Sequence, residues 1–243
     1  MDMSQDNNAN HSVTPLTLET MRKEAEERIS IINKEFKEGF DFLTKHPSSV
    51  TIFGSAKFTE ENFYYQKARE LAFNIVKETG FSVITGGGPG IMEAANRGAK
   101  EAGGNSIGFG ITLPKEQKTN EYVTESLDFH YFFSRKVCLS FSAEAFIYFP
   151  GGFGTLDEFF EVITLVQTRK LHHLPIFLFG EDYWRPIDSY FKEKLLEYKT
   201  IEKEDRELYT ITDDLDSIVE AVKNDSRVIA GVRRRKDQKE ANE

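Results

Sequence analysis

The sequence predicts an α/β fold in which helices cover both faces of a mainly parallel sheet. Short apolar runs alternate along the chain with longer segments whose apolar residues recur every three to four positions. Several of the apolar runs end in glycine, as tight strand-to-helix turns often do. The chain has 243 residues, of which 39% are hydrophobic, and this is enough for one such domain with a full core. Strands that are separated by helices form a parallel sheet with both faces buried.

The N-terminal part of the chain contains two segments outside this alternation. Residues 1–15 are polar and rich in Asn and Asp, which predicts a disordered leader. A helical segment is expected at residues 16–46, because apolar side chains alternate at three- and four-residue steps from Leu18 to Leu43. Since this helix precedes the first strand, we expect it to pack on the outside of the sheet or on a partner subunit.

The alternation of strands and helices predicts one α/β domain at residues 47–224, followed by a flexible basic tail at 225–243. The expected strands cover residues 50–53, 81–85, 106–111, 129–133, 143–149, 175–179 and 209–211. The expected helices cover residues 63–76, 91–102, 134–142, 155–169, 184–198 and 213–223, the last with Asp213 as N-cap. Residues 113–128 form a polar loop of unusual length, which is often a sign of function.

Composition limits the classes of partner. The net charge of −9 argues against general affinity for nucleic acid or for an anionic membrane. No apolar run approaches the length that crosses a membrane, and Cys138, as the only cysteine, cannot form an intrachain disulfide. We therefore expect a cytoplasmic protein. No metal is expected, because the adjacent His172 and His173 do not face one site and no other cluster of ligands accompanies them.

Three predicted strands end in glycine-containing turns, at Gly54-Ser55, at residues 86–90 and at residues 151–154. Ligands of open α/β sheets bind at the carboxyl ends of the strands, so the three turns are expected to converge on one site. Tight turns also need glycine without any ligand, and this alternative stays open, above all for Gly54. The glycine content of the two longer turns favours a phosphate site.

The spacing of these glycines narrows the type of phosphate. The sequence Gly86-x-Gly88-x-Gly90 differs from the G-x-G-x-x-G fingerprint of dinucleotide sites, and no acidic residue ends the following strand. The chain also lacks the G-x-x-x-x-G-K-[ST] pattern of ATP-hydrolysing loops. A mononucleotide or a sugar phosphate therefore fits the site best.

Charged residues lie close to the glycine turns. Glu158 follows Thr155 by three residues on the predicted helix, and it either serves chemistry at the site or closes a capping box with Thr155 as N-cap. Arg135 and Lys136 form a clamp for phosphate or a transition state, or a surface ion pair. Arg97 follows the second glycine turn, where it reaches either phosphate or solvent.

Two motifs resemble those of a known family. Residues 150–158, Pro-Gly-Gly-Phe-Gly-Thr-Leu-Asp-Glu, match the PGGxGTxxE signature of the LONELY GUY (LOG) proteins, which are cytokinin riboside 5′-monophosphate phosphoribohydrolases. Residues 86–92 resemble their second glycine motif, and the likeness covers about residues 48–222. The resemblance implies a Rossmann-like, doubly wound fold and a homodimer or higher homo-oligomer with its site near the subunit interface. It also implies hydrolysis of the N-glycosidic bond of a nucleoside 5′-monophosphate, AMP or an N6-modified AMP, to free base and ribose 5-phosphate, without a cofactor.

The same resemblance implies roles for individual residues. Arg135 and Glu158 correspond to the catalytic pair. The residues implied to bind the substrate are Gly54, Ser55, Gly88, Gly90, Met92, Lys136, Gly152, Gly154 and Thr155. Phe133 stands where plant-like members have histidine, and this form resembles a longer bacterial branch that also carries an N-terminal helical extension.

Two other functions are alternatives to this hydrolase. Members of the longer branch have been described as lysine decarboxylases, but no lysine lies in a sequence setting suited to a Schiff base with pyridoxal phosphate. A non-catalytic carrier of a nucleotide or of molybdenum cofactor could use the same phosphate cradle. Arg135 and Glu158 favour the enzyme over the carrier, because a carrier needs no carboxylate beside a phosphate.

Overall fold

The computed structural model describes residues 17–112 and 119–224. The predicted leader, part of the long loop and the basic tail lie outside the described residues, and the proposed domain boundaries stay predictions. Within the described part, a sheet of seven strands has the order β4-β3-β2-β1-β5-β6-β7. Each strand pairs in parallel with its neighbours. The strands are β1 (Ser49–Phe53), β2 (Ser82–Thr85), β3 (Ser106–Ile111), β4 (Glu125–Phe129), β5 (Ala143–Tyr148), β6 (Ile176–Phe179) and β7 (Thr210–Thr212).

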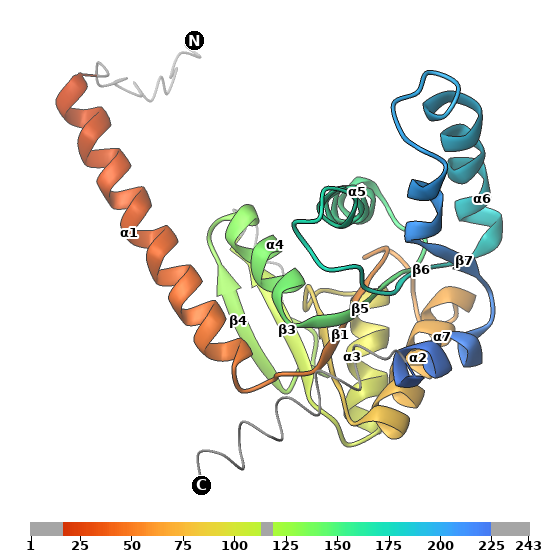
Figure 1. The fold of residues 1–243 in the computed structure, drawn as a ribbon. Coiled ribbons are helices and arrows are strands. Elements are labelled where there is room, and N and C mark those ends of the chain that lie inside the picture. Colours follow the sequence, from red (N-terminus) through yellow and green to blue (C-terminus); the bar gives the residue numbers. More distant parts are fainter. Residues whose placement is uncertain (1–16, 113–118, 225–243) are drawn as a thin grey trace, which may run out of the picture.

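Helices cover both faces of this sheet, so the predicted doubly wound α/β fold is confirmed (Figure 1). The helices are α1 (Leu18–Leu43), α2 (Phe63–Thr79), α3 (Ile91–Glu101), α4 (Phe132–Phe141), α5 (Phe153–Gln167), α6 (Glu181–Tyr190) and α7 (Leu215–Asn224). A π-helical segment, Phe191–Leu195, continues α6, and a 3₁₀ helix, Glu204–Leu208, precedes β7. In Figure 1, α4 and α5 lie on one face of the sheet, and α2, α3 and α7 lie on the other.

The core consists of two apolar clusters, one on each side of the sheet. Strand β5 shows how one strand supplies both, because successive side chains of a strand point to opposite faces. Ala145 and Ile147 pack into the cluster with α2, α3 and α7, whereas Phe146 and Tyr148 pack into the cluster with α4, α5 and α6. A central strand buried on both faces reads as a nearly continuous apolar run in the sequence, and β5, in which Glu144 is the one charged residue, could be predicted for this reason.

Strand β4 differs from its prediction. The aromatic residues 129–133 were expected to form the strand, yet β4 runs from Glu125 to Phe129 and includes residues assigned to the loop. Its register with β3 extends from Ile107–Glu125 to Ile111–Phe129, so the pairing stops where β3 stops. As an edge strand, β4 carries exposed polar residues and lacks a continuous apolar run.

The last helix also begins differently from its prediction. The expected N-cap, Asp213, instead accepts hydrogen bonds through Oδ1 from Gly180 N (3.1 Å) and Glu181 N (2.9 Å), at the start of α6. Asp214 is the residue that caps α7, because its Oδ1 accepts from Asp216 N at 3.0 Å. Either aspartate satisfies the sequence rule for an N-cap, and only the packing of α6 against β7 separates them.

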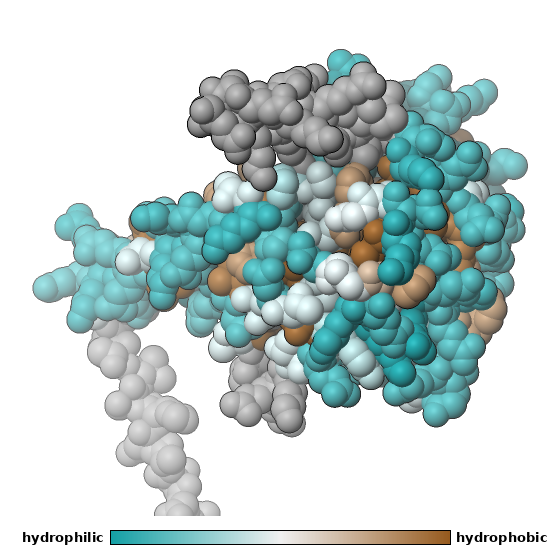
Figure 2. Space-filling model, turned by 90° about the horizontal axis from the view of Figure 1, so that it is seen from below, coloured by the Kyte–Doolittle hydropathy of each residue, from teal (hydrophilic) through white to brown (hydrophobic). Residues whose placement is uncertain are grey.

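Helix α1 leaves the body of the molecule at its N-terminal end, and its C-terminal half contacts α4 (Figure 1). Thr17 caps it through a capping box with Thr20, and most of its side chains are exposed. The face of the molecule in Figure 2 is mainly hydrophilic, with small hydrophobic areas between polar side chains. No helix among the described residues is long and apolar enough to span a membrane.

Candidate active site

A pocket of about 610 Å³ opens at the carboxyl ends of β1 and β5. These neighbouring strands form the point where the strand order reverses, since the chain builds β2, β3 and β4 on one side and β6 and β7 on the other. Ligands of open α/β sheets bind at this switch point. The pocket is lined by Phe53, Gly54, Ser55, Ala56, Lys57, Phe58, Gly86, Met92, Ile111, Phe132, Arg135, Pro150, Gly151, Gly152, Gly154, Thr155, Asp157, Glu158 and Tyr183.

The three glycine turns meet at this pocket and hold one another in place. Ser55 N donates to Pro150 O at 3.0 Å, and Ile91 N donates to Ser55 O at 2.9 Å. Gly90 has a φ of 72° and lies so close to Ser55 that a Cβ atom would collide with the carbonyl oxygen of that residue. Backbone geometry alone therefore requires glycine at position 90, which is the alternative that explains a turn glycine without any ligand.

The start of α5 explains how the third turn could hold an anion. The N-cap is Gly152, which has no side chain to satisfy the first N–H groups, and the helix begins at Phe153. The first backbone bond at this end runs from Leu156 N to Gly152 O (3.1 Å), so the preceding N–H groups remain available to a ligand. Bare N–H groups at a helix N-terminus form a ready site for phosphate.

Thr155 lies inside the first turn of α5, so it is not an N-cap and the capping box with Glu158 is wrong. Phe153 begins the helix although its side chain is 92% exposed, and an exposed aromatic residue gave no sign of a helix start. Thr155 is buried, and its Oγ1 fills the space beside Gly151 that a Cβ atom would need. Glu158 consequently has no role in capping α5.

Glu158 is a buried carboxylate at the wall of the pocket. The residue is only 9% exposed, and no hydrogen bond or ion pair from another described residue reaches its carboxylate. Burial raises the pKa of Glu158 from its usual 4.5 to about 7, although Lys136 and Arg135 act in the opposite direction. A carboxyl group poised near neutral pH inside a pocket is typical of acid–base and electrostatic catalysis.

Arg135 approaches the same pocket from α4. Its Nε donates to Phe109 O at 2.7 Å, which anchors the guanidinium group above Gly86. A Cβ atom on Gly86 would collide with this guanidinium, so the glycine leaves the space that Arg135 occupies. Burial lowers the pKa of Arg135 while the nearby Glu158 raises it, and arginine stays charged in either case.

Lys136 has a different environment from its neighbour Arg135. Its Nζ pairs with Asp157 Oδ2 at 2.7 Å and with Glu161 Oε2 at 2.6 Å, both on α5, and it does not line the pocket. The ion-pair alternative therefore describes Lys136, and the clamp alternative fits Arg135. The two ion pairs tie α4 to α5 and place a positive charge close to Glu158.

Comparison with known proteins identifies the family. A family model described as "possible lysine decarboxylase" matches residues 92–222, more than half of the chain. The cytokinin riboside 5′-monophosphate phosphoribohydrolase of Rhodococcoides fascians is 31% identical over 157 residues, which cover 62% of this chain and 77% of that protein. The chain belongs to the LOG family. A probable cytokinin riboside 5′-monophosphate phosphoribohydrolase of Arabidopsis thaliana is 30% identical over 170 residues, which cover 67% of the chain and 80% of that protein.

Solved structures similar to this LOG-family chain include the molybdenum cofactor carrier protein of Chlamydomonas reinhardtii. The match has a TM-score of 0.54 at 23% identity and covers 75% of the chain and 98% of the carrier protein. At this identity the likeness establishes the fold alone. The carrier fold and the LOG fold are thus the same, and the contents of the pocket must distinguish their functions.

The pocket of this LOG-family chain contains most of the residues that the resemblance implied. Eight of them line it: Gly54, Ser55, Met92, Arg135, Gly152, Gly154, Thr155 and Glu158. Three do not. Gly90 shapes the turn from behind, Lys136 lies between α4 and α5, and Gly88 lines a smaller adjoining space with Gly86, Gly110 and Thr119. The functional roles of all these residues stay predictions.

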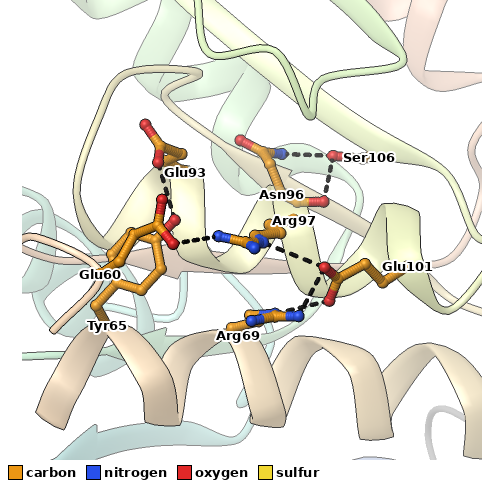
Figure 3. A network of polar contacts seen from close by, with 8 residues as sticks. All are labelled: Glu60, Tyr65, Arg69, Glu93, Asn96, Arg97, Glu101 and Ser106. Carbon is orange, nitrogen blue, oxygen red and sulfur yellow. Dashed lines mark hydrogen bonds and ion pairs between the residues drawn. The ribbon is translucent and has the colours of Figure 1, made fainter. Parts of the chain in front are cut away.

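Arg97 does not reach the pocket. Figure 3 shows it between Glu60 and Glu101, with which it forms ion pairs of 2.7 and 3.1 Å. Arg69 on α2 joins the same network through Glu101 on α3. Arg97 was expected to reach either phosphate or solvent. It instead pairs with carboxylates, which the packing of α2 against α3 places beside it.

The same close-up shows that Asn96 is structural. Its Nδ2 donates to Ser106 Oγ at 2.9 Å (Figure 3). Its Oδ1 accepts from Thr85 Oγ1 at 2.7 Å. Thr85 Oγ1 in turn accepts from Gly87 N, so this buried network supports the second glycine turn from below. Asn96 therefore acts on the shape of the turn and does not line the pocket.

Several residues of the pocket were not predicted from the sequence. Tyr183, at the start of α6, donates through Oη to Gly151 O at 2.7 Å and so fixes the third glycine turn. Phe132 and Ile111 supply an apolar wall, and Lys57 stands exposed at the rim. These residues belong to no glycine motif, and only the fold brings them together.

The residues of the pocket do not fit a pyridoxal phosphate-dependent decarboxylase. Such an enzyme needs a lysine whose amine is free to form a Schiff base in a protected site. Lys136 is held by two carboxylates, and Lys57, the lysine that lines the pocket, is exposed. The description of the family model as a decarboxylase therefore finds no support in this donor set.

Proposed function

We propose that this chain is a phosphoribohydrolase, which hydrolyses the N-glycosidic bond of a nucleoside 5′-monophosphate, AMP or an N6-modified AMP, to free base and ribose 5-phosphate. The observation that carries the proposal is the buried Glu158 carboxylate, which shares a pocket with a bare helix N-terminus and with Arg135. The names of the relatives in Rhodococcoides fascians and Arabidopsis thaliana support the same reaction.

The chemistry follows from the charge that develops on the sugar. Breaking the bond between C1′ and the base nitrogen builds positive charge on the ribose, as in other glycoside hydrolyses. The Glu158 carboxylate stabilises that charge and activates the attacking water, and burial strengthens both effects because little solvent screens them. Arg135 orients the nucleotide and stabilises negative charge on the departing base or the phosphate.

The phosphate provides binding energy away from the bond that breaks. The first N–H groups of α5 and the hydroxyl of Thr155 face the pocket as donors for the 5′-phosphate. Binding energy gained there is used to hold C1′ beside Glu158. A nucleoside without the phosphate should therefore be a poor substrate.

The carrier is the second candidate, because its fold is shared. A carrier must hold a phosphate, but it gains nothing from a carboxylate, since burying that charge beside an anion costs free energy. Glu158 is 9% exposed and has a pKa near 7. Burying this carboxylate costs free energy, and a hydrolase has a use for the buried group whereas a carrier has none. The carrier is therefore the less favoured candidate.

We further propose a homodimer, or a higher homo-oligomer, in the cytoplasm. Phe133, Val137 and Phe141 of α4 and Phe153 of α5 are exposed apolar side chains on the helices that carry the catalytic pair. Large exposed apolar residues gathered on two adjacent helices are typical of a protein interface. Cys138 is a buried free thiol, as suits a reducing compartment.

The test is direct product analysis. The purified chain is incubated with AMP, with N6-isopentenyl-AMP and with adenosine, and free base and ribose 5-phosphate are measured by chromatography. We expect base from at least one nucleotide and little from adenosine. Glu158→Gln should abolish most turnover and leave nucleotide binding measurable, whereas Glu220→Gln, an exposed glutamate on α7, should match the unmodified chain. Tight retention of a phosphorylated ligand without release of base would favour the carrier, and a fully active Glu158→Gln variant would rule out the assigned mechanism.

A further inference from the structure

The N-terminal helix α1 contains one feature that its surface position does not explain. Glu35 lies on this mostly exposed helix, yet it is only 7% exposed. A carboxylate is costly to bury unless its oxygens accept hydrogen bonds. The partners of Glu35 therefore indicate what the helix is built to hold.

Among the described residues, the hydrogen-bond partners of Glu35 lie immediately before α4 and in its first turn. Oε1 accepts from the backbone N–H groups of His130 and of Tyr131, the latter at 3.4 Å. Oε2 accepts from Ser134 Oγ at 2.5 Å. The N-cap of α4 is Tyr131, whose own side chain makes no capping bond. Glu35 thus places, from a different helix, a negative charge at the N-terminus of α4 and holds the residues at which that helix begins.

The contact between α1 and α4 is tight beyond this cap. One turn after Glu35, Gly39 lies so close to Cys138 that a Cβ atom would collide with the sulfur. The rings of Phe40 and Phe141 are 4.6 Å apart at the next position. Because close-packed helices cannot slide without repacking, α1 fixes the position of α4 along its whole length.

Arg135 is the residue that this arrangement affects. It follows Ser134 directly, and its backbone N–H donates to Tyr131 O at 3.2 Å, so both of these neighbours are residues that Glu35 holds. Its side chain then crosses to Phe109 O and into the nucleotide pocket. A frayed first turn of α4 would let the guanidinium leave its place over Gly86.

We infer that Glu35 is a positioning residue, through which the N-terminal helix holds Arg135 in the geometry that binds the nucleotide. The inference rests on the proposed function, because it takes the pocket to be the nucleotide site. It gives α1 a role in the activity of its own subunit, in addition to any role as an interface. Glu35 does not line the pocket, so it acts on the nucleotide only through α4.

The test is a double-mutant cycle that uses the dissociation constant for AMP, measured by calorimetry without turnover. Glu35→Ala should weaken binding by about five- to tenfold, as expected when the hydrogen bonds of a buried carboxylate are lost. Glu35→Gln keeps an oxygen for the two N–H groups and should lose less. The matched control is Glu38→Ala on the same helix, whose side chain is 51% exposed and which should change binding by less than about twofold.

The cycle is completed in an Arg135→Gln background. If Glu35 acts through Arg135, the added Glu35→Ala change should weaken binding by less than about twofold there, since the contact it supports is already gone. An equal loss in both backgrounds, or no loss in either, would overturn the inference. Should Glu35→Ala fail to fold, Glu35→Gln completes the same cycle. A chain that binds AMP yet releases no base contradicts the proposed hydrolysis alone, because the cycle reads binding.

Discussion

The ion pairs of Lys136 make the pH dependence of the reaction predictable. The pKa of Glu158 is about 7 because burial raises it, and Lys136 is the strongest influence that opposes burial. Lys136→Met removes this cation and also frees Asp157 and Glu161, which raise the pKa of Glu158 further. All three effects have the same sign, so the pKa of Glu158 must rise in the variant.

The magnitude follows from general values for neighbouring charges. Removing an opposite charge beside a buried carboxylate raises its pKa by about one unit or more, or about 1.4 kcal/mol. If Glu158 acts as the carboxylate, a shift from about 7 to about 8 lowers the ionised fraction at pH 7 from about one half to about one tenth. We therefore expect kcat/KM to fall about fivefold at pH 7 and by only about a tenth at pH 9.

The assay is the pH profile of kcat/KM for AMP hydrolysis, from pH 5.5 to 9.5, for the unmodified chain and the variant. The substrate phosphate titrates in both profiles alike, so the difference between them reports the enzyme. Lys223→Met is the matched control, because Lys223 also forms a 2.7 Å ion pair, with Glu78, but on the exposed surface away from the pocket. A loss that persists at pH 9 would instead show a direct contact between Lys136 and the substrate. An acidic limb that stays in place or moves to lower pH would refute the reasoning.

Three further predictions concern stability and the glycine turns. The pKa of Glu158 is raised from 4.5 to about 7, so the folded state loses stability as the pH rises through that range. Glu158→Gln should therefore increase the free energy of unfolding, measured by urea denaturation, by up to about 3 kcal/mol at pH 8 and hardly at all at pH 4. A Cβ atom on Gly154 would have no atom within 4 Å, so Gly154→Ala should stabilise α5 by about 0.5–1 kcal/mol in thermal unfolding. It should nevertheless weaken AMP binding in calorimetry, because the added methyl group lies where the first turn of α5 is expected to bind the phosphate. Tyr183→Phe removes the hydrogen bond to Gly151 O and should cost about 1 kcal/mol of stability and raise KM more than it lowers kcat; an unchanged KM would contradict a role in shaping the turn.

The sequence predicted the strands of the sheet closely, β7 at one edge included, but misplaced β4 at the other edge. Strand β5 was predictable because it is buried on both faces and its residues are nearly all apolar. Strand β4 was misplaced because an edge strand needs few apolar residues, while the adjacent aromatic residues at the start of α4 resembled a strand. A phosphate site for a mononucleotide or sugar phosphate could be predicted from the glycine spacing, because each turn is formed by residues that are contiguous in the sequence.

The contents of the pocket were only partly predictable, for a different reason. Glycine motifs are contiguous in sequence, so Gly54, Gly152 and Gly154 could be assigned before the fold was known. Tyr183 of α6 reaches Gly151, which lies 32 residues earlier in the chain, and no local sequence pattern predicts a contact over that separation. Lys136 was implied to bind the substrate together with Arg135, but neighbouring residues on a helix point in different directions, and Lys136 does not line the pocket.

Arg135 and Lys136 differ in their partners, and this difference determines which positive charge is available to a ligand. Both cations lie near Glu158 and oppose its protonation, but the charge of Lys136 is already offset by Asp157 and Glu161. Arg135 has no carboxylate within ion-pair distance among the described residues, and its hydrogen bond goes to a neutral backbone carbonyl. Its charge therefore remains available to an anion that enters the pocket. A bound 5′-monophosphate would complete this pairing, whereas a neutral nucleoside would leave Arg135 without an anion, and we therefore expect the site to favour a phosphorylated substrate.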